Sequence, residues 1–112
     1  MKQKVSDYIA DHIAEWGIRD VFTVTGGGAM HMNDAFGHHP KLHCTYQHHE
    51  QACAMAAEAY ARMDNRMAAV CVTTGPGATN AITGVLGGWM DSIPMLVFSG
   101  QARYATTVAA SG

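Results

Sequence analysis

The sequence predicts an α/β fold: a doubly wound, mostly parallel sheet with flanking helices. Helical and strand patterns alternate along the 112 residues, and the short apolar runs end in glycine or polar segments. Strands separated by helices form right-handed βαβ units, which build a parallel sheet. We expect one domain over residues 1–112. Because the sequence stops soon after an apolar run, we also expect it to be part of a longer chain.

The first helix and strand are predicted from spacing and composition. Ser6 is suited to cap a helix that continues to Trp16, and Gly17 is suited to end it. One face of this helix carries, at helical spacing, Tyr8, Ile9, His12, Ile13 and Trp16. Residues 20–26 are rich in β-branched side chains and end in glycine, which indicates a strand.

The remaining elements repeat this alternation. Helices are expected, in order, over residues 27–39, 49–63 and 76–90, and strands over 42–47, 67–75 and 93–101. The second of these helices is rich in Ala and leaves through Asp64 and Asn65, and the third has Pro76 in its first turn. Residues 67–75 contain a continuous apolar run, as expected for a strand buried on both faces.

Composition excludes several classes of protein. A hydrophobic content of 48% fits a globular domain, and a net charge of −2 gives no footprint for nucleic acid. No apolar run is long enough for a membrane span, and the N-terminus lacks a signal-peptide core. The three cysteines lack disulfide spacing, so we expect reduced thiols and a cytoplasmic location. Cys44, Cys53 and Cys71 are nucleophiles only in principle, and Cys53 and Cys71, inside a helix and an apolar strand, are interpreted as small buried hydrophobes.

The polar and glycine-rich segments all follow predicted strands. In a parallel α/β sheet, ligands bind beyond the carboxyl ends of the strands. The segments at that edge are TGGGA after the first strand, QHHE after the second, TTGPGATN after the third and SGQ after the fourth. Neither glycine segment fits the dinucleotide fingerprint, and no phosphate-binding loop ends in Gly-Lys-Ser/Thr. One such turn alone is typical of tight strand-to-helix geometry, but two on one edge favour a ligand.

Glu50 and the histidines near it allow several interpretations. HHEQAC resembles the start of a zinc-protease helix, but Cys53 stands where the second histidine is needed. The histidines lack metal-site spacing and are interpreted as polar loop residues, some partly packed: His31, His38, His39, His43, His48 and His49. No metal ligand is therefore predicted in this chain. Glu50 suits the first turn of a helix through the helix dipole, by about 0.5 kcal/mol, and its place on the ligand edge also suits a chemical role.

Three segments, in this order and spacing, resemble a known family. They are HHEQACAMAAEAYAR, VTTGPGATNAITGV and DSIPMLVFSGQ. They resemble the N-terminal pyrimidine-binding domain of thiamine-diphosphate enzymes, in the acetolactate synthase branch. The resemblance extends from the first helix to Gln101. It implies a decarboxylase or carboligase that acts on a 2-keto acid. The enzyme class would then be a lyase or a transferase.

The resemblance also implies roles for individual residues. In the family a glutamate hydrogen-bonds the ring nitrogen N1′ of the cofactor and so promotes its imino tautomer. The imino nitrogen then removes the thiazolium C2 proton. The resemblance implies this glutamate role for Glu50. Cofactor binding is implied for Pro76, Asn80, Thr25, Gly26 and Gly27. Proximity to the substrate is implied for Gly28, Ala29 and Gln101.

Some family features differ or are missing. The branch has an aromatic residue and a proline where this chain has Thr25 and Gly26, and the segment after Gln101 differs as well, so the substrates are left open. The family's G-D-G…N-N motif, which binds diphosphate and Mg²⁺, does not occur. Family sites form between two subunits, which implies a homodimer or homotetramer, and the need for FAD is left open. We expect the 112 residues alone to be inactive.

Two other functions compete with this interpretation. The chain could be the pyrimidine-domain subunit of a two-chain decarboxylase, which a neighbouring coding region with G-D-G…N-N would favour. It could instead be a degenerate domain that only binds a partner or small ligand. The intact Glu50 argues against degeneration, although its role at the helix start leaves this interpretation open.

Overall fold

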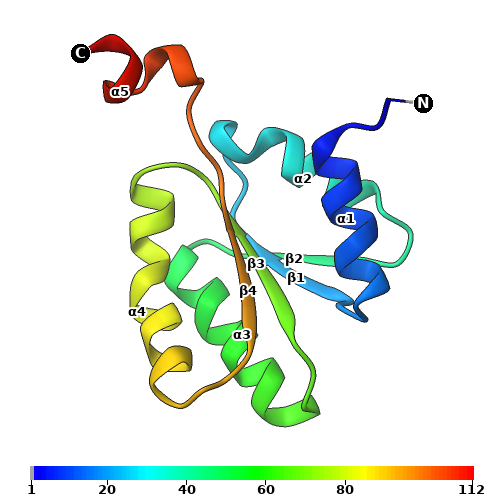
Figure 1. The fold of residues 1–112 in the computed structure, drawn as a ribbon. Helices are drawn as coiled ribbons and strands as arrows, with labels where there is room; N and C mark the ends of the chain where they lie inside the picture. The colour runs from blue at the N-terminus through cyan, green and yellow to red at the C-terminus, as the bar shows by residue number, and fades with distance from the viewer. Residues whose placement is uncertain (1) are drawn as a thin grey trace.

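A computed structural model describes residues 2–112 (Figure 1). Its longer elements are α1 (Val5–Glu15), β1 (Asp20–Thr23), α2 (Met30–His38), β2 (His43–Tyr46), α3 (Glu50–Asp64), β3 (Ala68–Val72), α4 (Pro76–Met90) and β4 (Met95–Ser99). Shorter helical turns are η1 (Gly27–Ala29), η2 (Tyr104–Thr106) and α5 (Val108–Ser111). None of the helices in this described part of the chain is long and apolar enough to cross a membrane.

The four strands form one parallel sheet in the order β2-β1-β3-β4. Val21 of β1 pairs with Cys44 of β2, and Val70 of β3 pairs with Val97 of β4. Each strand reaches the next through a helix, so all four strands point the same way and their carboxyl ends share one edge. The predicted doubly wound α/β sheet is confirmed.

Helices cover both faces of the sheet and create two cores (Figure 1). On one face α1 and α2 bury Ile13 and Phe36 against β1 and β3. On the other face α3 and α4 bury small side chains, among them Ala54 and Ala57, against β3. All five residues of β3 are buried, as its continuous apolar pattern predicts.

The beginning of α1 differs from the prediction. The helix starts at Val5 with Lys4 as its N-cap, so Ser6 lies inside the helix. Ser6 is buried, and its hydroxyl has no hydrogen-bond partner within residues 2–112. The capping preference of serine is outweighed here because the same position faces the core. Gly17 ends the helix at φ +86°, as expected for a residue in the left-handed region.

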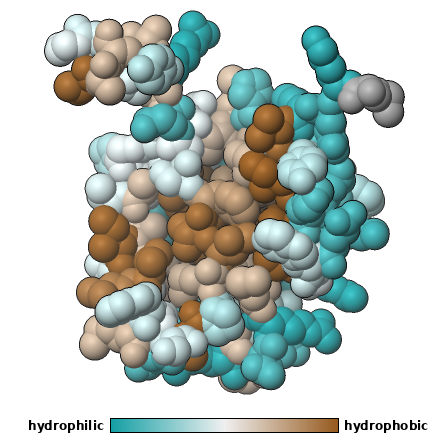
Figure 2. Space-filling view, viewed as in Figure 1, coloured by the Kyte–Doolittle hydropathy of each residue, from teal (hydrophilic) through white to brown (hydrophobic). Residues whose placement is uncertain are grey.

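An apolar surface lies along β4, the last strand of the sheet, and we call it the β4 edge surface. Figure 2 shows it as brown atoms across the middle of the face where β4 lies in Figure 1. One groove lies between α1 and β4 and is lined by Tyr8, Ile9, His12, Ile13, Trp16, Leu96 and Phe98. A second groove lies between α4 and β4 and includes Ile82, Leu86, Trp89 and Val97. The open first groove explains why Tyr8 and Trp16, which share one face of α1 with the buried Ile13, are 51% and 65% exposed.

The helices α3 and α4 pack closely through small residues. A Cβ atom added to Gly84 of α4 would lie 2.5 Å from Cβ of Ala54 and 3.0 Å from the backbone nitrogen of Met55. Such contacts require displacement of the α3 backbone. The predicted helix over residues 76–90 is confirmed, and its glycines, which lower intrinsic helix stability, are accounted for by this close packing.

Candidate functional site

The four strands end on a common edge where the predicted site residues follow them. Glu50 is the first residue of α3, and His49 caps that helix by accepting a hydrogen bond at Nδ1 from the amide of Gln51 (3.1 Å). Across this edge, Nδ2 of Asn80 in α4 donates to Oε2 of Glu50 at 3.1 Å. The turn after β2 and the first turns of α4 therefore meet at the Glu50 carboxylate.

The second carboxylate oxygen of Glu50 lies beside a glycine. A Cβ on Gly77 would lie 3.4 Å from Oε1 of Glu50 and 2.7 Å from the methyl carbon Cγ2 of Thr73. Oε1 receives no hydrogen bond from residues 2–112. The carboxylate is thus held at one oxygen, and the other borders space that Gly77 keeps free of side-chain atoms.

The glycine loop after β1 is attached to the turn after β3. The amide of Gly28 donates to Oγ1 of Thr73 at 3.0 Å. The amide of Gly26 donates to Oδ1 of Asn33 at 3.4 Å, and Nδ2 of Asn33 donates to the buried hydroxyl of Thr23 at 3.2 Å. These contacts fix the loop at both ends.

Gln101, which follows β4, joins the same loop. Its amide donates to the carbonyl of Gly28 at 3.1 Å, and its Oε1 accepts from the hydroxyl of Thr74 at 3.0 Å. The backbone of Gly100 approaches Gly28 so closely that a Cβ at Gly100 would overlap the Gly28 carbonyl. Glycine at position 100 is therefore required by space.

The predicted site residues fall into two groups. Glu50 and Asn80 are in direct contact, and Gly28 contacts Gln101. The remaining positions lie around these groups: Thr25 and Gly27 are exposed, Gly26 is half-buried, Pro76 is the exposed first residue of α4, and Ala29 is 2% exposed, with its side chain in the core.

Sequence reasoning missed several residues that contact the predicted site residues. They are Asn33, Thr73, Thr74 and Gly77. The signal for two of them was present, because two threonines stand directly before the glycine-rich turn, at the end of an apolar run. Nothing in local spacing indicates which hydroxyl faces the loop after β1, since that depends on how β1 and β3 pair.

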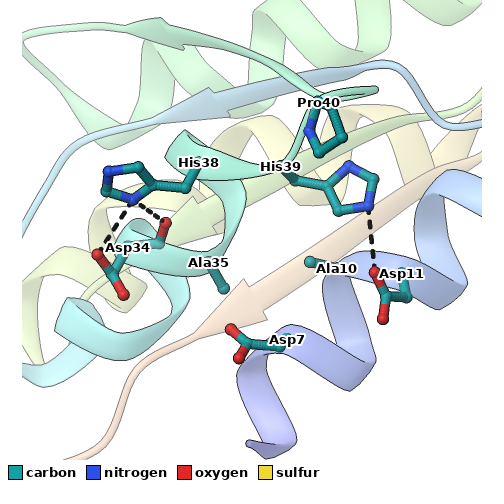
Figure 3. A pocket seen from close by; sticks show the side chains of 8 residues that line it. All are labelled: Asp7, Ala10, Asp11, Asp34, Ala35, His38, His39 and Pro40. Carbon is teal, nitrogen blue, oxygen red and sulfur yellow. Dashed lines mark hydrogen bonds and ion pairs between the residues drawn. The ribbon is translucent and has the colours of Figure 1, made fainter.

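A cavity of about 270 Å³ between α1 and α2 contains histidines and carboxylates but none of the predicted site residues (Figure 3). His39 is 3.3 Å from the Asp11 carboxylate, and His38 is 3.2 Å from that of Asp34. The His39 side chain is only 12% exposed, which confirms that some histidines are partly packed. Within residues 2–112, no group of three His, Cys, Asp or Glu side chains is placed to hold a metal ion.

Burial governs the chemistry of the cysteines. Cys53 and Cys71 are fully buried, as predicted, and burial raises the pKa of each thiol to about 11. The nearby Glu50 carboxylate adds to the increase at Cys53. Cys44 is half-buried, and burial raises its thiol pKa as well.

This burial predicts the order in which the cysteines react. At pH 8, about one in a thousand Cys53 and Cys71 thiols is ionised, because that pH is three units below a pKa of about 11. We expect iodoacetamide to label Cys44 first, and the other two only after unfolding in urea. Mass spectrometry of the alkylated peptides measures this order. Rapid labelling of Cys71 in the native protein would contradict the burial of β3.

The fold agrees with the similarity of this chain to known proteins. Residues 3–110 match the family model described as "Thiamine pyrophosphate enzyme, N-terminal TPP binding domain". The chain is 36% identical over 96 residues to the acetolactate synthase large subunit of Lactococcus lactis, which covers 86% of this chain and 17% of that protein. It is 37% identical over 99 residues to acetolactate synthase 2, chloroplastic, of Zea mays, covering 88% and 16%.

A bacterial relative is more similar over a shorter length. The acetolactate synthase large subunit of Buchnera aphidicola (strain Sg) is 45% identical over 85 residues, covering 76% of this chain and 15% of that protein. Matches to these three relatives span 15–17% of their lengths. The chain therefore belongs to the thiamine pyrophosphate-dependent, acetolactate synthase-like enzyme family, which it matches through the N-terminal TPP-binding domain.

Proposed function

We propose that this domain supplies the carboxylate that activates thiamine diphosphate in a decarboxylase or carboligase acting on a 2-keto acid. One observation carries the proposal. Glu50 lies at the carboxyl edge of the sheet with Oε2 bound by Asn80 at 3.1 Å and Oε1 free of any bond from residues 2–112. A carboxylate held in this way has one oxygen available for a proton on a bound ligand.

The residues around Glu50 fit the aminopyrimidine ring of the cofactor. Gly77 leaves room beside Oε1, since a Cβ there would lie 3.4 Å from that oxygen. Pro76 and Asn80, in the first two turns of α4, are exposed, so they are available to line a flat ring. The exposed Thr25 and Gly27 and the half-buried Gly26 belong to the loop that would approach the cofactor from β1.

In this proposal Oε1 of Glu50 would hold the exchangeable proton that faces the ring nitrogen N1′ of the bound cofactor. Asn80 keeps the carboxylate oriented for that exchange because its amide occupies the other oxygen. Gln101 and Gly28, joined by a backbone hydrogen bond, would border the substrate. When bound, the cofactor supplies the carbon nucleophile and the electron sink for decarboxylation.

The rest of the active unit lies outside these 112 residues in this proposal. The sequence has no G-D-G…N-N motif, so binding of diphosphate and Mg²⁺ is assigned to a second domain. We propose assembly as a homodimer or homotetramer, in which that domain comes from another subunit. The relatives named above are acetolactate synthases, which favours a carboligase, and residues of other domains would contribute to the choice of substrate.

Exchange of the cofactor C2 proton tests the proposal. With Mg²⁺ and the full-length protein, we expect exchange into D₂O, followed by proton NMR, to be at least about 100-fold faster than for free thiamine diphosphate. The 112-residue chain alone should give negligible heat of binding in titration calorimetry, because it lacks the diphosphate-binding motif. Unaccelerated exchange with the full-length protein, or micromolar binding by the 112-residue chain, would contradict the proposal.

A further inference from the structure

The side chain of Thr73 lies between the two halves of the candidate site. It follows β3 directly and is half-buried. Its hydroxyl oxygen accepts a hydrogen bond from the amide of Gly28 at 3.0 Å. Its methyl carbon would lie 2.7 Å from a Cβ on Gly77, the glycine that borders the Glu50 carboxylate. One side chain thus contacts both the loop after β1 and the first turn of α4.

Thr73 also explains why the loop after β1 needs glycine. A Cβ on Gly26 would lie 2.5–2.7 Å from three side-chain atoms of Thr73. The φ of Gly26 is −169°, an extended conformation that any residue adopts, so the requirement for glycine comes from space and not from backbone conformation. At Gly28 a Cβ would lie 3.0 Å from the Thr73 hydroxyl oxygen and 2.9 Å from the Thr74 methyl carbon.

The loop held by Thr73 in turn holds Gln101. The carbonyl of Gly28 accepts a hydrogen bond from the amide of Gln101 at 3.1 Å, while the amide of the same Gly28 donates to Thr73. Displacement of Gly28 would therefore move the backbone of Gln101. Thr74 adds a second connection, because its hydroxyl donates to Oε1 of Gln101 at 3.0 Å.

We propose that Thr73 is a positioning residue whose hydroxyl sets the place of the Gly26–Gly28 loop and whose methyl sets the place of Gly77 beside Glu50. The two atoms have separable roles. Loss of the hydroxyl frees the amide of Gly28 while the methyl contacts stay. Loss of the methyl opens space at Gly77 while the loop stays attached. The catalytic part of this inference depends on the proposed function, whereas the attachment of the loop does not.

Two substitutions separate these roles. Thr73→Val keeps the shape of the side chain and removes the acceptor, and Thr73→Ser keeps the acceptor and removes the methyl. The matched control is Thr83→Val, because Thr83 is exposed on α4 and its hydroxyl forms no hydrogen bond with residues 2–112. Urea denaturation of all three variants reports whether each one folds.

Amide hydrogen exchange of the full-length protein measures the attachment of the loop. In Thr73→Val we expect the peptide that contains Gly28 to exchange about tenfold faster, since one hydrogen bond is lost. In Thr73→Ser and Thr83→Val it should exchange at the native rate. Native-rate exchange in a folded Thr73→Val variant would overturn the proposed attachment. If Thr73→Val does not fold, slow native-like exchange in Thr73→Ser supports the hydroxyl role and fast exchange overturns it.

Steady-state kinetics of the full-length protein measure the effect on the site. We expect Thr73→Val to lower kcat about tenfold or more, because displaced site groups are costly to the reaction, while Thr83→Val retains native kcat. Faster exchange at Gly28 with unchanged kcat would overturn the positioning role and leave a structural one. If the native protein shows no thiamine-dependent activity, the proposed function fails, and the exchange result still decides whether Thr73 holds the loop.

Discussion

We expect the Glu50→Gln variant of the full-length protein to lose at least about 100-fold in C2 proton exchange and in turnover. Glutamine matches the shape of glutamate and can still face Asn80, but its amide cannot take up or release a proton at the Oε1 position. The fold should survive, because Glu50 is half-buried at the start of α3 and its contribution to the helix dipole is about 0.5 kcal/mol. Proton NMR of cofactor in D₂O gives the exchange rate.

The control for this variant is another glutamate of the same helix. Glu58 of α3 forms a hydrogen bond with Arg62 and lies outside the candidate site. Glu58→Gln should therefore leave C2 exchange at the native rate. Near-native exchange in Glu50→Gln, with far-ultraviolet circular dichroism unchanged, would show that another group activates the cofactor.

The second large effect concerns the packing of α3 against α4. We expect Gly84→Ala to lower the free energy of unfolding by about 1–3 kcal/mol, because the new methyl meets Cβ of Ala54 and the backbone of Met55. Gly88→Ala introduces the same methyl into the same helix. There it meets the terminal methyl of Met95, a flexible side chain that can move aside. Gly88→Ala should be neutral or more stable by up to about 1 kcal/mol, since alanine favours helix.

Urea denaturation followed by circular dichroism measures both variants. Both substitutions replace glycine with alanine in the same helix, so the difference between their unfolding free energies reports how much more costly the contact of position 84 with α3 is than the contact of position 88 with Met95. A Cβ added to Gly84 would lie only 2.5 Å from Cβ of Ala54. Equal stability of Gly84→Ala and Gly88→Ala would therefore mean that α3 and α4 are farther apart than this distance implies.

Much of the fold was predictable because it depends on local patterns. The helix over 76–90 was located to the residue, since Pro76 begins it and apolar residues continue through it. The strand β3 was recognisable from an uninterrupted apolar run. Asn65 ends α3 in the left-handed conformation, which matches the predicted exit at Asp64 and Asn65. Glu50 was placed in the first turn of α3 by the same local signals.

The features that were missed depend on contacts between distant segments. Serine is favoured at helix starts, but Ser6 packs into the core one residue inside α1. The contact of Thr73 with Gly28 depends on the pairing of β3 with β1, which no local pattern encodes. The sequence also suggested no helix after β4, yet the short α5 forms there with exposed residues. A helix of four residues is too short to show a helical spacing of apolar residues in the sequence.

The contacts of the candidate site join residues that are far apart in the sequence. Glu50 and Asn80 are 30 residues apart, and Gly28 and Thr73 are 45 apart, so no single βαβ unit contains the whole site. Contacts of this range require long loops to close, which costs chain entropy, and they need the segments that follow all four strands. The site therefore cannot exist in a partly formed sheet. Any ligand that binds it favours the complete sheet over every partly folded form, and so stabilises residues far from the edge where it binds.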